Sequence, residues 1–215
     1  MIAYLSTDKK MCMATIDTVV FDLGGVLVDW NPEYLYKEIF PDEKERSWFL
    51  SHICTLDWNE EQDAGRTLKE GTDYLVREYP EHEKHIRMYY DRWKEMLGGP
   101  IHETVEIFRH LKEKSKVRLY ALTNWSAETF PLALELYEFL HWFDGRLVSG
   151  AEKIRKPSPD IYKLLISRYD IDPTRSVYVD DNLRNVIPAR ELGFYGIHFQ
   201  GPGQFRQELE KLGVW

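Results

Sequence analysis

The 215-residue sequence has no long apolar run and only two cysteines. No segment approaches the ~20 consecutive apolar residues that a membrane-spanning helix needs, so we expect no such helix. Residues 1–13 contain Lys9 and Lys10 but no long apolar stretch and no clear cleavage site, and they do not resemble a secretion signal. We therefore expect a cytoplasmic protein.

The two cysteines, Cys12 and Cys54, could form one disulfide, but a chain of this length needs none to build a core. We interpret them as free thiols in a reducing compartment.

Basic residues are outnumbered, with 28 Lys and Arg against 36 Asp and Glu and a formal net charge of −8. A surface of this sign repels nucleic acid and anionic membranes, so we set both aside as partners. A small phosphorylated substrate is still compatible with it, because a metal ion and one lysine can create a local positive site. We expect a monomer or a homodimer.

Short runs of apolar, β-branched or aromatic residues are spaced along the chain, and segments with helical patterns separate them. Strands that alternate with helices predict a parallel sheet covered on both faces. The fold class is therefore α/β, a Rossmann-like doubly wound sheet. The predicted strands are residues 16–21, 117–122, 145–148, 176–179 and 195–199.

Residues 31–98 break this alternation, because they contain no strand-like run. They are rich in Glu, Lys, Tyr and Trp, with apolar residues such as Ile86 and Tyr90 at helical spacing. We predict an all-helical cap domain at 31–98, inserted into a core domain made of residues 14–30 and 99–215.

Two helices of the predicted core have clear end signals. Ser158 can cap a helix whose first turn contains Pro159 and Asp160. A second helix, near residues 183–192, ends at Gly193, which suits a C-terminal cap.

Polar and charged residues stand at the ends of three predicted strands and before the Ser158-capped helix. Ligands of open parallel sheets bind beyond the carboxyl ends of the strands, so we expect these residues to meet at one edge. Each alone is ambiguous, since such residues are common in turns and on surfaces; the ordered set is more specific. The set comprises Asp22, Thr123, Asn124, Lys156, Asp180 and Asp181.

Crowded carboxylates at that edge would repel one another unless a cation lay between them, and their hard oxygen ligands suit Mg²⁺. A lysine and a hydroxyl could then hold a phosphate while an aspartate attacks phosphorus in line, giving an aspartyl-phosphate that water hydrolyses. This pattern favours a magnesium-dependent phosphatase.

Four motifs of the chain resemble those of the haloacid dehalogenase-like (HAD) hydrolase superfamily. They are residues 21–27 (Phe-Asp-Leu-Gly-Gly-Val-Leu), 122–124 (Leu-Thr-Asn), 156–162 (Lys-Pro-Ser-Pro-Asp-Ile-Tyr) and 179–185 (Val-Asp-Asp-Asn-Leu-Arg-Asn). The resemblance extends over residues 16–199 and implies a role for each matching position. It implies Asp22 as nucleophile; Thr123 and Lys156 as catalytic residues; Thr123, Asn124, Lys156 and Gly25 as phosphate-binding residues; and Asp22, the main chain of Gly24, Asp180 and Asp181 as the Mg²⁺ site.

In this superfamily the second acid of such a pair usually ligates the metal directly, so Asp181 is expected to touch the ion and Asp180 to act mainly through water. The predicted cap is similar to the small helical cap of one large subgroup, which closes over small phosphorylated metabolites.

One position departs from the superfamily pattern. Most of its phosphatases carry a second aspartate two residues after the nucleophile, which protonates the leaving group, and here Gly24 stands there. A positioned acid is worth about 10²–10⁴-fold in rate. We therefore expect either leaving groups that depart without help or a proton from elsewhere. The form Asp-Leu-Gly-(Gly/Asn)-Val resembles a branch that includes an α-D-glucose-1-phosphate phosphatase, so sugar phosphates are among the expected substrates.

Two alternatives stay open. A metal-independent haloacid dehalogenase would also use an aspartate nucleophile, but the pair Asp180 and Asp181 would repel a haloacid carboxylate. A non-catalytic phosphate-binding regulatory module would explain the glycine at position 24. Substrate selection could involve four cap-region residues that could equally pack the cap itself or be solvated: Trp30, Trp58, Gln62 and Arg66.

Overall fold

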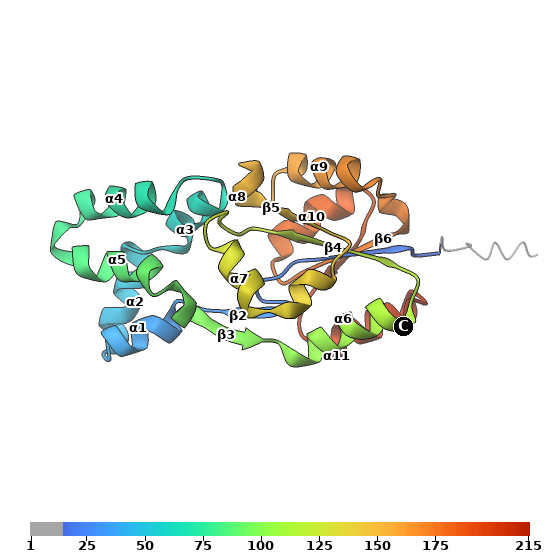
Figure 1. Ribbon diagram of the computed structural model, residues 1–215, viewed down its shortest axis with the longest axis horizontal. Helices are drawn as coiled ribbons and strands as arrows, with labels where there is room; N and C mark the ends of the chain where they lie inside the picture. The colour runs from blue at the N-terminus through green and yellow to red at the C-terminus, as the bar shows by residue number, and fades with distance from the viewer. Residues whose placement is uncertain (1–14) are drawn as a thin grey trace, which may run out of the picture.

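The computed structural model describes residues 15–215 (Figure 1). Its main sheet consists of β1 (Thr18–Phe21), β4 (Arg118–Thr123), β5 (Gly145–Val148), β6 (Ser176–Asp180) and β7 (Tyr195–His198). The strand order is β5-β4-β1-β6-β7, and every neighbouring pair is parallel. The five predicted runs thus all form strands, with small shifts at their ends, and the predicted parallel α/β fold is confirmed.

Helices cover both faces of this sheet, and Figure 1 shows α6 and α11 on the side opposite α9. The core helices are α6 (His102–Lys114), α7 (Phe130–Leu136), α8 (Ser149–Glu152), α9 (Pro159–Tyr169), α10 (Leu183–Glu191) and α11 (Pro202–Lys211). Successive strand residues point to opposite faces. The Phe21 ring lies 5.3 Å from Phe108 of α6 and 5.6 Å from Phe205 of α11, whereas Val20 packs in a second cluster with Tyr162 of α9.

The end signals predicted for two core helices are confirmed. The Ser158 hydroxyl accepts a hydrogen bond from the backbone of Asp160 at the start of α9. After α10, Gly193 adopts a left-handed φ of 102° and donates to the carbonyl of Arg190.

A group of helices between β1 and β4 forms the opposite end of the molecule from the core helices α6 and α11 in Figure 1. They are α1 (Glu33–Ile39), α2 (Glu43–His52), α3 (Leu56–Asp63), α4 (Leu68–Glu78) and α5 (Glu83–Asp91), with short 3₁₀ turns at Pro80–His82 and Trp93–Met96. We call them the cap helices. Aromatic residues fill their interior; for example, the rings of Trp58 and Tyr89 lie 5.1 Å apart. Thr67 and Glu70 form a reciprocal capping box at the start of α4.

A short antiparallel ribbon joins the cap helices to the core, and the sequence did not predict it. It consists of β2 (Val28–Trp30) and β3 (Leu97–Pro100), so the expectation of no strand within 31–98 is wrong at Leu97 and Gly98. Glycine and proline have low strand propensity, and this pairing depends on a partner far away in the sequence.

Two further expectations concern the membrane and the cysteines. Among the described helices, none combines the length and apolarity needed to cross a membrane. Cys54 is buried, and Cys12 lies outside the described residues.

Candidate active site

Three carboxylates meet at the carboxyl edge of the sheet. Phe21 and Val179 are paired in the register of β1 and β6, so the residues that follow them, Asp22 and Asp180, lie side by side. Asp181 comes next in the chain, and one oxygen from each of the three acids lies within 4.8 Å of the others. Asp22 and Asp180 are buried, and Asp181 is exposed. This donor set of hard oxygens fits a divalent cation such as Mg²⁺.

Lys156 is fully buried between two of these acids. Its Nζ lies 2.9 Å from Oδ1 of Asp22 and 2.7 Å from Oδ2 of Asp180. Burial alone would lower the pKa of Lys156, but the charges of Asp180 and Asp22 outweigh it and raise the pKa above its usual value. Lys156 is therefore a fixed positive charge at the edge where a phosphate would bind.

Asn124 holds the main chain of Lys156 in place. Its Oδ1 accepts from the Lys156 amide at 2.8 Å, and its Nδ2 donates to the Lys156 carbonyl at 3.0 Å. The peptide bond between Lys156 and Pro157 is cis. Because both polar atoms of the Asn124 side chain are engaged, we interpret Asn124 as the residue that positions Lys156. Its role in phosphate binding stays a prediction.

Asp180 is surrounded by hydrogen-bond donors. Besides Lys156, its carboxylate accepts from the Tyr178 hydroxyl at 2.6 Å, the Asn182 amide at 2.8 Å and Nδ2 of Asn185 at 3.1 Å. Burial disfavours its charge, but Lys156 and these donors lower the pKa of Asp180 below its usual value. Asp180 is thus tied to the protein by several donors, and the expectation that Asp181 touches the ion directly stays a prediction.

Asp22 and Asp181 are in the opposite electrostatic situation. Burial and then the charge of Asp180 raise the pKa of Asp22 well above its usual value, and Lys156 only partly offsets them. The same two causes raise the pKa of Asp181. The Leu23 amide and Lys156 both contact Oδ1 of Asp22, so Oδ2 is the atom that can face phosphorus. A cation at the cluster would favour the ionised form that attacks.

Thr123 provides an unpartnered hydroxyl beside the cluster. The residue is 1% exposed, and its Oγ1 has no hydrogen-bond partner within the described part of the chain. Buried hydroxyls are normally hydrogen-bonded, so this atom suits an oxygen of a bound phosphate.

Gly25 allows Asp181 to approach the first motif. Its φ is 72°, and a Cβ built on it would lie 2.2 Å from Oδ2 of Asp181. The Gly25 amide donates to the carbonyl of Val28 at 2.9 Å, so its N–H is already engaged. Only glycine leaves space for the Asp181 carboxylate at this position, and the phosphate contact of Gly25 stays a prediction.

A cavity of about 90 Å³ lies between the strand ends and the cap helices. It adjoins Gly24 of the first motif, and its wall combines four aromatic rings with five polar or charged side chains, as ligand sites combine apolar surface with polar groups. Its lining consists of Gly24, Trp30, Asn59, Asp63, Tyr90, Trp93, Asn124, Trp125, Ser126 and Thr129.

Of the four candidates for substrate selection, only Trp30 lines this cavity. Trp58 is buried and donates from Nε1 to the carbonyl of Gly71, within the cap. Gln62 is 1% exposed and donates to Tyr90, and Arg66 donates to Gln62 and to the carbonyl of Trp58. The last three residues thus pack and connect the cap helices themselves. Arg66 is hydrogen-bonded there and not simply solvated.

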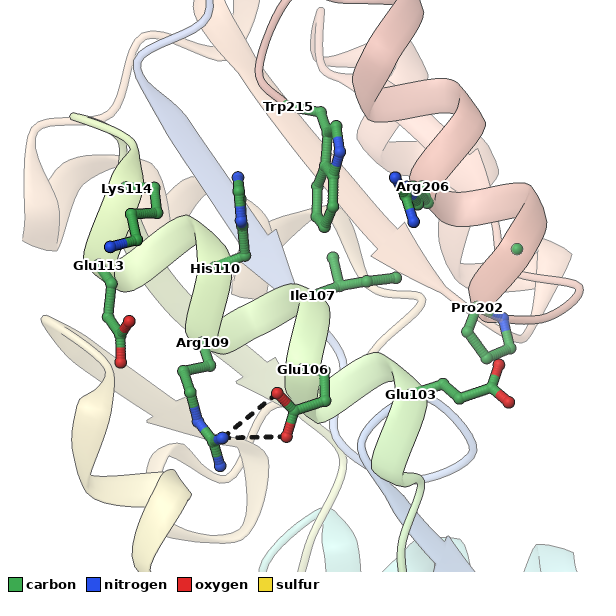
Figure 2. A pocket seen from close by; sticks show the side chains of 11 residues that line it. Glu103, Glu106, Ile107, Arg109, His110, Glu113, Lys114, Pro202, Arg206 and Trp215 are labelled. Atoms are coloured by element: carbon green, nitrogen blue, oxygen red, sulfur yellow. Dashed lines mark hydrogen bonds and ion pairs between the residues drawn. The ribbon is translucent and has the colours of Figure 1, made fainter.

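A larger surface cavity of about 550 Å³ lies between α6 and α11 (Figure 2). Figure 2 shows the Trp215 ring there between His110 and Arg206; its centroid is 4.1 Å from the His110 ring and 4.6 Å from the Arg206 guanidinium carbon. None of the strand-end residues lines this cavity. We therefore place the chemistry at the carboxyl edge of the sheet.

Several known proteins are similar to this chain. A sesquiterpene phosphatase, astK of Aspergillus oryzae, is 27% identical over 203 residues, which span 94% of this chain and 98% of that protein. A HAD-family enzyme of Bacteroides thetaiotaomicron, solved with magnesium and inorganic phosphate, is 25% identical with a TM-score of 0.62 and covers 83% of this chain and 91% of its own. A predicted HAD-like family hydrolase of Porphyromonas gingivalis shares the fold with a TM-score of 0.71, at 22% identity, over 93% of this chain and 98% of its own.

The family comparison covers most of the fold described above. Residues 16–193 match the haloacid dehalogenase-like hydrolases, a span that contains β1, the cap helices and all the strand-end residues. The chain therefore belongs to the haloacid dehalogenase-like hydrolase family.

Proposed function

We propose that this protein is a magnesium-dependent phosphatase that hydrolyses small phosphorylated metabolites through an aspartyl-phosphate at Asp22. The observation that carries the proposal is the placement of Lys156 between Asp22 and Asp180, with the unpartnered hydroxyl of Thr123 at the same edge. A nucleophile, a fixed cation and a hydroxyl donor are the protein groups that phosphoryl transfer requires.

The metal site of the proposal comprises Asp22, Asp181 and the main-chain carbonyl of Gly24, with Asp180 acting through water and through Lys156. Bound Mg²⁺ would supply charge neutralisation for the phosphate and for the crowded carboxylates. The chain's own groups do the rest: Oδ2 of Asp22 attacks phosphorus, while Lys156 and Thr123 hold phosphate oxygens. The solved relative that holds magnesium and phosphate supports this reading.

The cavity supports a small substrate. Its volume of about 90 Å³ and its wall of Trp30, Trp93 and Trp125 suit a compact leaving group with apolar faces. Sugar phosphates fit this description, because their C–H faces stack on aromatic rings while Asn59 and Ser126 offer polar contacts. The similarity to a sesquiterpene phosphatase adds short isoprenoid phosphates to the candidates.

Phosphate release from aryl, sugar and isoprenoid phosphates, measured with Mg²⁺ and with chelator, tests the proposal. We expect release only with Mg²⁺, and none from the Asp22→Asn variant. Equal release in chelator, or an active Asp22→Asn variant, would refute it. A separate measurement of chloride release from 2-chloropropionate, made in chelator, tests the dehalogenase alternative. We expect no chloride release.

A further inference from the structure

The first motif leaves an open space where the family's usual acid would stand. A Cβ built on Gly24 would meet no atom within 4 Å, and Gly24 borders the cavity. An alkoxide leaving group needs a proton as its bond to phosphorus breaks, so a donor must reach this cavity from another element.

Asp63, the last residue of α3, lines the same cavity as Gly24. Its main chain is fastened to the core: the Ser149 hydroxyl donates to the Asp63 carbonyl at 2.5 Å and accepts from the Trp125 amide at 3.0 Å. The main chain of Asp63 is therefore anchored to the core beside the cavity that Asp63 lines together with Gly24.

The position of Asp63 is unfavourable for a residue with a merely structural role. An acidic side chain at the C-terminal end of a helix opposes the helix dipole. No lysine, arginine or histidine within the described residues forms a salt bridge with Asp63; its carboxylate accepts from the Ser126 backbone and, at 3.4 Å, from Nδ2 of Asn59. A buried acid without an ion-pair partner at the wall of a cavity is a candidate for catalysis.

The surroundings of Asp63 allow it to carry a proton near neutral pH. Burial, and then the charge of Glu60, raise the pKa of Asp63 to about 7, while Arg155, the Ser126 backbone and Lys156 act in the opposite direction. The other titratable groups that face it are Tyr89 and Tyr90 of α5, and both have pKa values raised by burial, so they stay neutral.

We propose that Asp63 is the general acid and base of this phosphatase, supplied by the cap helices in place of a side chain at position 24. The inference rests on the proposed function and adds the residue that Gly24 cannot provide. It also widens the expected substrate range, because an acid that donates a proton allows alkyl esters, whose leaving groups need that proton, to be hydrolysed.

The chemistry divides into two steps. In the first, Oδ2 of Asp22 bonds to phosphorus, the bond from phosphorus to the leaving oxygen breaks, and the proton of Asp63 passes to that oxygen. In the second, water attacks the aspartyl-phosphate and gives a proton to the Asp63 carboxylate, while the bond from phosphorus to Asp22 breaks. The products are an alcohol and inorganic phosphate, and Asp63 is again protonated.

The test compares Asp63→Asn with the wild-type protein on p-nitrophenyl phosphate and on the alkyl phosphate that the wild type hydrolyses fastest. For the alkyl ester we expect kcat/KM to fall by about 10²–10⁴-fold. For the aryl ester we expect a rapid burst of nitrophenolate followed by slow turnover, because only the second step still needs the base. Equal losses in the first step for both esters, or no loss, would overturn the proposal.

Three further measurements sharpen the result. Asp57→Asn, in the exposed first turn of the same helix, is the matched control and should behave as wild type. Adding Gly24→Asp to Asp63→Asn should restore alkyl hydrolysis, since the new side chain has room. In the wild type, kcat/KM for the alkyl ester should fall above about pH 7, where Asp63 loses its proton, while kcat/KM for the aryl ester should not. This measurement uses the wild type alone, so it does not depend on whether a variant folds.

Failure of the inference is distinguishable from failure of the proposed function. If the wild type is active with Mg²⁺, Asp22→Asn is inactive and Asp63→Asn is as active as the wild type, the proposed function holds and the role of Asp63 is refuted. A wild type that hydrolyses aryl esters and no alkyl ester also overturns the role of Asp63.

Discussion

The ammonium group of Lys156 lies 2.7 Å from Oδ2 of Asp180, and neither side chain has any exposed surface. Removing one partner of a buried ion pair leaves the other charge uncompensated, which costs about 3–5 kcal/mol. We expect Lys156→Met to lower the free energy of unfolding by about that amount in urea titrations. Phosphate release should fall at least about 10²-fold, because a fixed positive charge is lost from the site.

The control for this experiment is Lys163→Met, on the helix α9 that follows Lys156, where the Lys163 side chain is 61% exposed. It should unfold at the same urea concentration as wild type and keep full activity. A Lys156→Met protein of unchanged stability would show that Asp180 is neutral, contrary to its lowered pKa.

Gly25 and Asp181 provide a second prediction, because their contact leaves no space for a methyl group. A Cβ at position 25 would lie 2.2 Å from Asp181, at a φ of 72° that side chains avoid. We expect Gly25→Ala to raise the Mg²⁺ concentration for half-maximal activity by about 10–100-fold, as displaced metal-site residues do. Gly203→Ala, on α11 and away from the site, is the control, because its Cβ would meet nothing within 4 Å. If Gly25→Ala and the wild type need the same Mg²⁺ concentration, Asp181 is not a ligand of the metal.

The sequence predicted the core because its signals are local. Buried parallel strands are short apolar runs, and the polar residues that follow them must lie at one edge once the strands are parallel. Asp22, Thr123, Lys156 and Asp180 could thus be placed before their contacts were seen. The same reasoning could not show that the Asn124 side chain bonds to the main chain of Lys156, because that contact joins residues 32 positions apart.

The features that the sequence did not predict depend on distant pairings. Strand β3 has weak local propensity and forms only against β2. Asp63 ends a polar helical segment and looks like a solvated acid in the sequence; only the contact to Ser149, 86 residues later, brings it to the cavity. Asn185 lies at the end of a recognised motif, but its bond to Asp180 depends on the packing of α10 against β6.

The raised pKa of Asp63 has a consequence for stability that does not depend on activity. The folded-state pKa is about 7, whereas an aspartate in the unfolded chain has a pKa of about 3.9. The folded protein holds this proton more tightly, so the contribution of Asp63 to the free energy of unfolding decreases as pH rises from about 4 to about 7. Asp63→Asn removes that decrease.

We therefore expect Asp63→Asn to be more stable than wild type at pH 8, by about 1–3 kcal/mol, since one pKa unit corresponds to about 1.4 kcal/mol and water in the cavity reduces the full effect. The difference should vanish near pH 4. Urea titrations across this range measure it, with Asp57→Asn as control. A variant less stable than wild type at pH 8 would mean that the charged Asp63 stabilises the fold.

Glu60 connects the cap helices to the core, and its removal should loosen the cap and also lower the pKa of Asp63, which the charge of Glu60 helps to raise. Its carboxylate lies 2.5 Å from Arg155, beside Lys156, and 2.5 Å from Arg184, near Asp181. Partly exposed ion pairs of this kind are worth about 0.5–1 kcal/mol each. If cap closure helps to bind substrate, Glu60→Gln should raise KM by about fivefold, a factor that corresponds to about 1 kcal/mol.

The control for Glu60 is Glu61→Gln, because Glu61 makes a longer contact of 3.4 Å to Arg155 and is 53% exposed in its side chain. Its KM should change by less than about twofold. Salt should act like the substitution, so about 0.5 M salt should raise the wild-type KM toward that of Glu60→Gln and change the variant little. An unchanged KM together with unchanged protease sensitivity of the cap helices would show that the ion pairs of Glu60 do not hold the cap closed.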